Sequence, residues 1–437
     1  MFASRCKNIV RFSSAALLAL LSAPAFAADG TGSFQVSMDT VWLVTAAALV
    51  FFMQAGFALL EGGMVRSKNT VNVIMKNYVD ACVGSIVFWL VGYGLMFGVN
   101  ATGWLGTDHF LLGNAEHMDY SLLLFQTMFA ATCVTIASGA MAERTRYESY
   151  LVGAIGITAV IYPVYGSWAW GSLYTGSGWL KQMGFIDFAG STVVHSIGGW
   201  VALAGIIVLG PRLGRFDADG KARPIPGHNL TLVALGGFIL WLGWFGFNGG
   251  STAAAVPSIG LINLNTHLAA ASGAVGAMTT MWISRRPVLM TTTVNGSIGG
   301  LVAITAGCAT MEPMYAVITG LVAGFVLVGG DGFLNWLRLD DVVGAVPVHA
   351  FCGAWGTLAA GLFKTGDLFN PTQVLVQFIG VAAGFLWAFP LALLMYFLIH
   401  KTMGLRAGTL DEQRGLDFTE HSEVGYPEFQ TAMTHQK

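Results

Sequence analysis

Charged residues are scarce in this sequence. Asp, Glu, Lys and Arg make up 10% of its 437 residues, against about 25% in a soluble globular protein. A net charge of -2 without a basic patch gives no reason to expect nucleic acid as a partner. The hydrophobic share of 55% and the mean hydropathy of +0.65 indicate instead a polytopic membrane protein in contact with membrane lipid.

Signatures of catalysis and of cofactor binding are missing as well. The sequence contains no P-loop, zincin helix, nucleophile elbow or C-x-x-C pair. It therefore predicts neither an enzyme nor a cofactor or metal site. Cys82, Cys133, Cys308 and Cys352 fall within apolar runs, where packing explains a cysteine better than a disulfide framework does.

Residues 1–28 have the pattern of a cleaved signal peptide. A basic stretch precedes a short apolar core at 15–21, and Ala25-Phe-Ala27 forms a small-residue cleavage site. The alternative, a first transmembrane helix, is weaker because the apolar run is too short. The predicted organisation is a signal peptide at 1–28, a membrane domain at 29–400 and a polar tail at 401–437, with the mature N-terminus outside.

Apolar runs of about 20 residues predict an all-α fold with eleven transmembrane helices. Since eleven is odd, the C-terminus is expected in the cytoplasm. Basic residues agree, because connections predicted to be external carry only Lys181 and Lys364. The predicted spans are about 40–61, 78–98, 121–142, 147–169, 190–210, 229–250, 262–283, 288–307, 312–330, 342–363 and 374–400.

One motif, D-x2-G-x3-V-H-x3-G, occurs twice, from Asp187 and from Asp341. In each copy a histidine, His195 or His349, follows the aspartate by eight residues, about 12 Å along a helix. If each aspartate marks a membrane surface, each histidine lies near the midplane. The two copies open predicted helices that run in opposite directions, which indicates an inverted repeat of helices 1–5 and 6–10 plus an eleventh helix.

Two histidines at equal depth on symmetry-related helices indicate a functional pair. Neutral imidazoles can share one proton, so His195 and His349 could hydrogen-bond a small polar solute or relay a proton. The alternatives are satisfied core histidines and axial ligands of a haem. Asp341 is expected to cap its helix, and Asp187, on the entrance side, to stabilise an incoming cation as well.

Aromatic residues gather towards the predicted external surface. Phe125 and Phe129 share a helix face, Trp170 ends another helix, and Phe247 and Ser251 end a third. They predict a vestibule for a small cation, with an interfacial aromatic belt as the alternative. Among the remaining polar residues, Thr305, Asn295 and Asn248 could line a path or bond neighbouring helices, Glu61 is expected to anchor at the interface, and the tail is expected to dock as an ordered segment.

Several of these segments resemble the ammonium transporter family (Amt/Mep/Rh), bacterial Amt type. The resemblance extends from about Val41 to Tyr426. It is carried by the segments 57–69, 139–144, 187–195, 244–251 and 415–417.

The resemblance implies eleven helices, a homotrimer and one conduction path per subunit. It implies recruitment of NH4+ at an external site and passage of NH3 through the pore to the cytoplasm, with possible separate proton transfer. The external site would comprise Phe125, Phe129, Trp170 and Ser251; Phe129 and Phe247 would form a gate, Asp187 would be the essential aspartate, and His195, His349 and Thr305 would line the pore.

The resemblance further implies nitrogen uptake across a bacterial inner (plasma) membrane. A PII-type regulatory protein could meet Arg212, Arg215 and Arg223 in the connection 210–228, although retention of that loop in the cytoplasm explains the same charges. Two other functions stay open: an ammonium sensor or receptor that binds but barely transports, and a Rhesus-type channel for neutral gas.

Overall fold

The computed structural model describes residues 30–113, 115 and 117–429. The predicted signal peptide, 1–28, and the last residues of the tail lie outside the described residues. Within the described part the chain is helical, with three isolated β-bridges and no strand.

Helices occupy each of the ranges in which the sequence predicts a span. Several of them are composite: a π-helical turn joins α3 to α4 and α6 to α7, and another opens each of the helices that carry the repeated motif. The elements are α2 (Gly30–Met64), α3 (Thr70–Val87) with η2 (Phe88–Gly92) and α4 (Tyr93–Phe97), α5 (His117–Ala140), α6 (Tyr147–Gly156) with η4 (Ile157–Ile161) and α7 (Tyr162–Ala169), α8 (Trp179–Gln182), η5 (Ser191–Ser196) with α9 (Ile197–Leu209), α10 (Leu230–Gly250), α11 (Ile259–Ile283), α12 (Met290–Ile304), α13 (Pro313–Trp336), η6 (Val346–Phe351) with α14 (Cys352–Leu362), α15 (Pro371–Thr402), α16 (Thr409–Arg414) and α17 (Leu416–His421).

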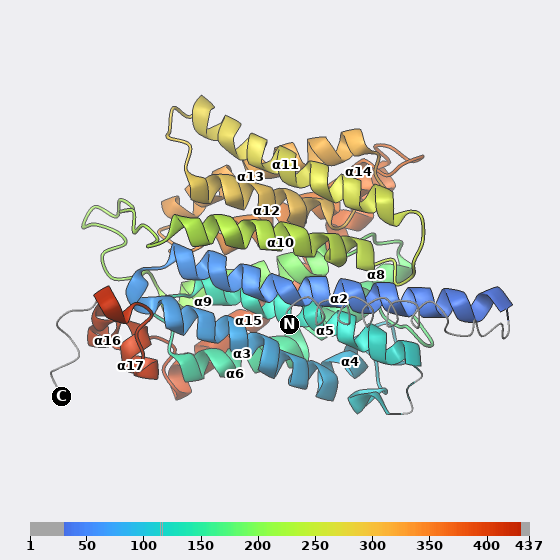
Figure 1. Ribbon diagram of the computed structural model, residues 1–437, viewed down its shortest axis with the longest axis horizontal. Helices are drawn as coiled ribbons and strands as arrows, with labels where there is room; N and C mark the ends of the chain where they lie inside the picture. The colour runs from blue at the N-terminus through green and yellow to red at the C-terminus, as the bar shows by residue number, and fades with distance from the viewer. Residues whose placement is uncertain (1–29, 114, 116, 430–437) are drawn as a thin grey trace, which may run out of the picture.

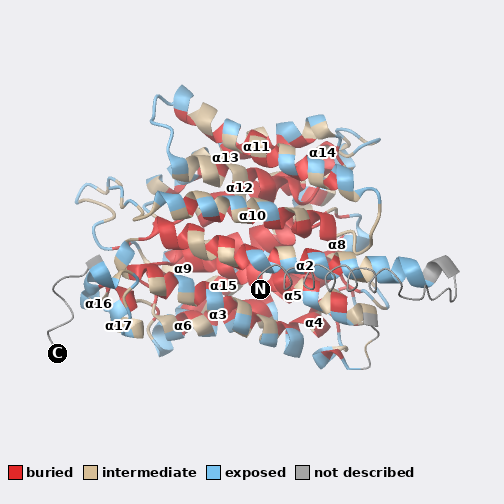
Figure 2. Ribbon diagram, in the orientation of Figure 1, coloured by how far each residue is buried: buried red, intermediate tan, exposed pale blue. Residues whose placement is uncertain are grey.

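The long helices lie side by side as a bundle (Figure 1). α2 packs along α10, and α11, α12 and α13 form a second packed group beyond α10. Buried residues fill the middle of the bundle and exposed residues lie on its outside (Figure 2). Large apolar side chains such as Phe238 and Leu386 face outwards, 69% and 68% exposed. An apolar outer surface fits a chain surrounded by lipid.

Among the described residues, eight helices are long and apolar enough to cross a membrane, and Val346–Leu362 is a shorter apolar helix. Helix α11 and the shorter α12 occupy the other two predicted spans. The chain is thus a multi-pass helical membrane protein, while the count of eleven crossings and the 5+5 repeat stay predictions. The first helix begins at Gly30 rather than near residue 40, and its 35 residues exceed the ~20 that a bilayer core needs.

The tail is ordered and docked as far as Phe429. The Asp417 carboxylate accepts a hydrogen bond from the backbone N–H of Asn72 at 2.8 Å, and the backbone N–H of Leu416 donates to the Asn69 side chain at 2.9 Å. Lys68 donates to the carbonyl oxygen of Glu412 at 2.7 Å. These bonds attach α16 and α17 to the turn between α2 and α3; the sequence predicts a docked tail but not this attachment point.

Candidate functional site

The two copies of the repeated motif have the same local geometry. Asp187 accepts hydrogen bonds from the backbone N–H groups of Gly190, Thr192 and Val193 at 2.8–2.9 Å. Asp341 accepts from the N–H groups three and five residues further on, in Gly344 and Val346, at 2.9 and 2.7 Å. Each aspartate therefore caps the π-helical turn that carries the following histidine.

A glycine in each motif allows the chain to turn from this cap into the helix. Gly190 has φ 113° and Gly344 has φ 79°, a left-handed conformation that favours glycine over residues with a Cβ atom. The spacing of aspartate, glycine and histidine is thus a structural requirement. It sets both histidines at matched positions, on η5 and η6.

His195 and His349 meet inside the bundle. Their Nδ1 atoms lie 3.2 Å apart, and the side chains are 0% and 4% exposed. One ring nitrogen must donate and the other accept, so the pair can share a single proton. A haem between the rings would have to separate two nitrogens that lie within hydrogen-bond distance, so this arrangement contradicts the axial-ligand alternative.

Aromatic rings continue the line from the histidines towards the α8 side of the bundle. The Phe247 ring lies 5.3 Å from His195 and stacks on Phe129 at 3.9 Å. Phe125 lies 4.6 Å beyond Phe129. The structure therefore brings Phe125, the Phe129–Phe247 stack and the histidine pair into one contiguous row.

Trp170 and Ser251 adjoin the same phenylalanines. The Trp170 ring lies 6.2 Å from Phe129, and its Nε1–H donates to the Asp187 carbonyl oxygen at 2.6 Å. The Ser251 hydroxyl donates to the Phe247 carbonyl oxygen at 2.8 Å, which leaves its oxygen lone pairs to accept from a solute. The residues predicted for an external cation site thus lie together, with Trp170 also fixing the segment of Asp187.

Thr305 takes an indirect position. Its Oγ1 accepts from Trp244 Nε1 at 2.9 Å, and the Trp244 ring stacks on His195 at 5.0 Å. Thr305 therefore orients the tryptophan that packs on the histidine. Asn248 donates to Thr266 at 2.8 Å, so it bonds neighbouring helices, as its alternative interpretation proposed.

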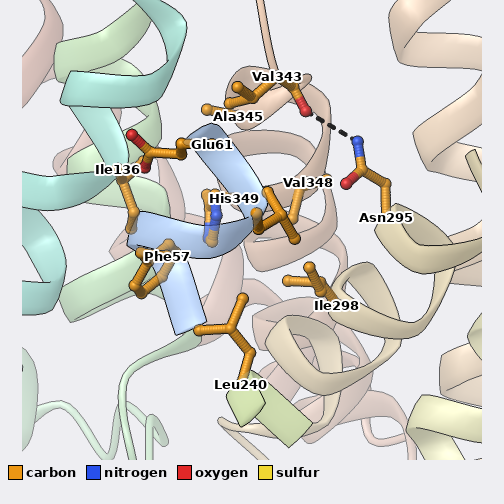
Figure 3. Close-up of a pocket in the computed structure, with 11 residues that line it drawn as sticks. Phe57, Glu61, Ile136, Leu240, Asn295, Ile298, Val343, Ala345, Val348 and His349 are labelled. Carbon is orange, nitrogen blue, oxygen red and sulfur yellow. Dashed lines mark hydrogen bonds between the residues drawn. The ribbon is translucent and has the colours of Figure 1, made fainter. Parts of the chain in front are cut away.

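A cavity lies beside His349, between α2, α5, α10, α12 and the segment leading into η6 (Figure 3). Apolar side chains make up most of its lining; its polar side chains are Glu61, Asn295 and His349. The predicted role of Glu61 as an interfacial anchor is wrong, since this carboxylate is 2% exposed inside the bundle. The Gly62–Gly63 pair predicts a helix end at Glu61, whereas α2 continues to Met64.

A charged cluster lies at the end of the bundle where the tail docks. The Glu143 carboxylate accepts from Arg66 and Arg212 at 2.7 and 3.1 Å, and the Asp340 carboxylate accepts from Arg212 and Arg215 at 2.8 and 3.1 Å. Burial would raise the pKa of Asp340, but the bonds from Arg212 and the nearby Arg144 charge hold that pKa well below its usual range. Burial would also raise the pKa of Glu143. The Arg212 charge and the hydrogen bonds from Arg66 outweigh burial, so that pKa is lowered.

This cluster changes the interpretation of the basic loop. The Arg212 side chain is 4% exposed, so it supports the fold and is not available to a partner protein. Arg215 is engaged in the same cluster. Arg223 keeps a side chain that is 65% exposed.

The row of residues suits a small, weakly polar solute. Past the phenylalanine stack, the imidazole nitrogens are the polar side-chain groups that the geometry brings together. A neutral solute needs few hydrogen-bonding partners beyond these. A bare ion would lose its hydration there at great cost. Within the described ranges, no group of three or more His, Cys, Asp or Glu side chains could hold a metal ion.

Comparisons with known proteins agree on one family. The sequence model of the Ammonium Transporter Family matches residues 41–426. Ammonium transporter Amt2 of Archaeoglobus fulgidus is 43% identical, over 96% of this chain and 96% of that protein. Ammonium transporter 3 of Dictyostelium discoideum is 36% identical, over 90% of this chain and 95% of that protein.

Solved structures give the same result. A structure described as a Sensor Amt Protein superposes with a TM-score of 0.87 at 40% identity, covering 90% of this chain and 100% of that chain. The crystal structure of Candida albicans Mep2 superposes with a TM-score of 0.78 at 28% identity, covering 86% of this chain and 87% of that chain.

Proposed function

This chain belongs to the ammonium transporter family, and on that premise we propose that it captures NH4+ at an aromatic site and conducts NH3 past a histidine pair. It is a membrane transporter for ammonium, not an enzyme. The capture site comprises Phe125, Phe129, Trp170 and Ser251. Asp187 fixes this site and stabilises the arriving cation, and the Phe129–Phe247 stack is the gate between the site and the histidines.

The observation that carries this mechanism is the contiguous row from Phe125 to His349. Aromatic faces attract a cation at its outer end. The stacked gate then allows only a small solute to pass. The histidine pair, with Nδ1 atoms 3.2 Å apart, offers one donor and one acceptor to ammonia, or carries the released proton separately. Potassium has no proton to release, so it meets the full cost of losing its water.

The positions of the basic loop and the tail helices support a direction for this transport. The basic connection 210–229 and the tail helices α16 and α17 lie at the same end of the bundle, opposite α8 (Figure 1). Under the positive-inside rule that end faces the cytoplasm of a bacterial inner membrane and the N-terminus lies outside. The protein acts as a homotrimer for nitrogen uptake, and Arg223 is the exposed arginine of the loop that would meet a PII-type protein.

The test uses purified protein in liposomes and records the transient current on an ammonium jump, with potassium and methylammonium jumps as controls. An ammonium-specific current that disappears in the His195→Ala, His349→Ala double variant is the expected result. Full retention of current in that variant would remove the histidines from the charge-moving path.

Two further functions are separated by the same experiment. The likeness to a protein described as a sensor favours ammonium sensing as the second candidate. Internal alkalinisation without current would establish Rhesus-type conduction of neutral gas. Neither current nor alkalinisation, together with saturable ammonium binding, would establish a sensor.

A further inference from the structure

Glu61 is a buried carboxylate that the transport path described above leaves without a role. It lies on α2 within a span of high hydropathy, Ser33–Met64, and is 2% exposed. An ionisable side chain at such a place is costly and therefore marks function more often than structure. The question is what its charge does there.

Position relates Glu61 to the histidine pair. Phe57 and Glu61 are four residues apart and so share a face of α2. The Phe57 ring lies 6.3 Å from the His349 ring, and Glu61 follows one helical turn further towards the end of the bundle where the tail docks. Both Glu61 and His349 line the cavity in Figure 3. Glu61 is therefore on the tail side of the pair, next along the path.

The cavity can hold a molecule between the two groups. The centre of a water molecule can move within a volume of about 20 Å³ in this cavity. That volume is enough to hold one water molecule. His349 uses Nδ1 towards His195, so its second nitrogen, Nε2, lies on the opposite edge of the ring. His349 and Glu61 line the same cavity, so a water molecule there could take a proton from the ring.

The surroundings of Glu61 do not explain it as half of an ion pair. Asn77 Nδ2 donates to its Oε2 at 3.1 Å, and no salt bridge joins it to any described arginine or lysine within the limit for an ion pair. Its charged or titratable neighbours are Lys76 and Asp80 on α3, Tyr150 on α6 and His349 on η6. Lys76 donates instead to the Thr145 carbonyl oxygen at 3.1 Å. The residues that α5, α10 and α12 contribute to the cavity are not titratable.

We propose that Glu61 is the proton acceptor on the tail side of the histidine pair. The His349 imidazolium loses its Nε2 proton to water in the cavity as an O–H bond forms on the Glu61 carboxylate. The carboxylic acid then releases the proton to water at the tail end, which restores the carboxylate. This role deepens the transport function proposed above and rests on it.

The decisive variant is Glu61→Gln. Glutamine keeps the shape of the side chain and an oxygen that accepts the hydrogen bond from Asn77, but it cannot take up a proton. The ammonium-evoked current should fall by at least about 100-fold, and Glu61→Asp should retain part of it. Glu148→Gln makes the same change at an exposed residue, with a side chain that is 72% exposed, and should match the wild type. Size-exclusion profiles of all variants confirm assembly.

A second readout separates proton uptake from a structural role. Infrared difference spectra on an ammonium jump should show a carboxylic acid C=O band in the wild type that is absent from Glu61→Gln. A wild-type current in Glu61→Gln would overturn the assignment. So would the absence of such a band from the wild type, which can be measured even if the variants fail to assemble. No current in the wild type would instead refute charge-moving transport, and a pH jump would then decide the protonation of Glu61 by the same band.

Discussion

At the scale of single residues, the two motif aspartates provide a comparison within one chain. Asp187 and Asp341 both cap a π-helical turn through bonds to N–H groups three and five residues further on. The proposed mechanism gives only Asp187 a second role, stabilising the cation. An Asp→Asn change at either position weakens the cap in the same way, because one carboxylate oxygen becomes an NH2 group that cannot accept.

We therefore expect Asp187→Asn and Asp341→Asn to lose similar stability, about 1–3 kcal/mol each, but to differ in transport. Asp187→Asn should lose far more of the ammonium current than Asp341→Asn. Thermal unfolding in detergent and ammonium-jump currents on both proteins measure the two effects. Equal losses of current would mean that Asp187 acts only as a cap.

A second prediction at this scale concerns the gate. Phe129 stacks on Phe247 at 3.9 Å, so Phe129→Ala opens a hole between the capture site and the histidines. We expect the variant to admit potassium, because hydrated ions could then reach the pair. Potassium- and ammonium-jump currents measure the change.

The matched control for the gate is Phe238→Ala on α10, a side chain that faces outwards and is 69% exposed. It should conduct like the wild type. If Phe129→Ala kept both its flux and its ion selectivity, the stack would not be the gate.

At the scale of secondary structure elements, the approach of η5 to α14 holds the histidines together. A Cβ atom on Gly353 would overlap the Ser191 carbonyl oxygen and lie 2.5 Å from the Ser196 Oγ atom. Gly353→Ala must push the two elements apart, at a cost of about 1–3 kcal/mol. Since His195 and His349 are carried by η5 and η6, we expect the current to fall with the stability.

Gly329→Ala is the matched control for this packing. Gly329 lies within α13, and a Cβ atom there would meet nothing within 4 Å. Alanine should be neutral or stabilising by about 0.5–1 kcal/mol. A Gly353→Ala protein with wild-type current and unfolding temperature would show that the close approach is dispensable.

The elements also show which features a sequence can predict. Apolar runs located the helices, and the repeated motif predicted that His195 and His349 would meet, because both follow from spacing along one chain. The burial of Glu61 and the engagement of Arg212 with Asp340 depend on which helices become neighbours, and no local pattern encodes that. The Trp170 bond to the Asp187 carbonyl oxygen was missed for the same reason, although the two residues lie only 17 positions apart.

At the scale of the whole molecule, the arginine–carboxylate cluster joins segments that are distant in sequence. Glu143 and Asp340 link the end of α5, the connection 210–229 and the segment before η6 through Arg212. Asp340 directly precedes Asp341, the cap of η6. The cluster therefore ties the tail end of the bundle to the element that carries His349.

Removing one carboxylate from this cluster leaves buried guanidinium groups without a partner. We expect Asp340→Asn to cost about 3–5 kcal/mol, measured by thermal unfolding in detergent. The exposed pair of Arg146 and Glu148, 3.6 Å apart, offers the control, since Glu148→Gln should change stability by no more than about 0.5 kcal/mol.

Acid should have the same effect as the Asp340→Asn change. The pKa of Asp340 is lowered in the folded protein, so its stabilising contribution is complete above the unfolded pKa, about 3.9. That contribution is lost as the pH falls below this value towards the folded pKa. As the pH falls below about 4, the unfolding temperature of the wild type should thus drop by more than that of Asp340→Asn, which has no such carboxylate to protonate. Parallel loss in both proteins would show that carboxylates other than Asp340 govern acid stability.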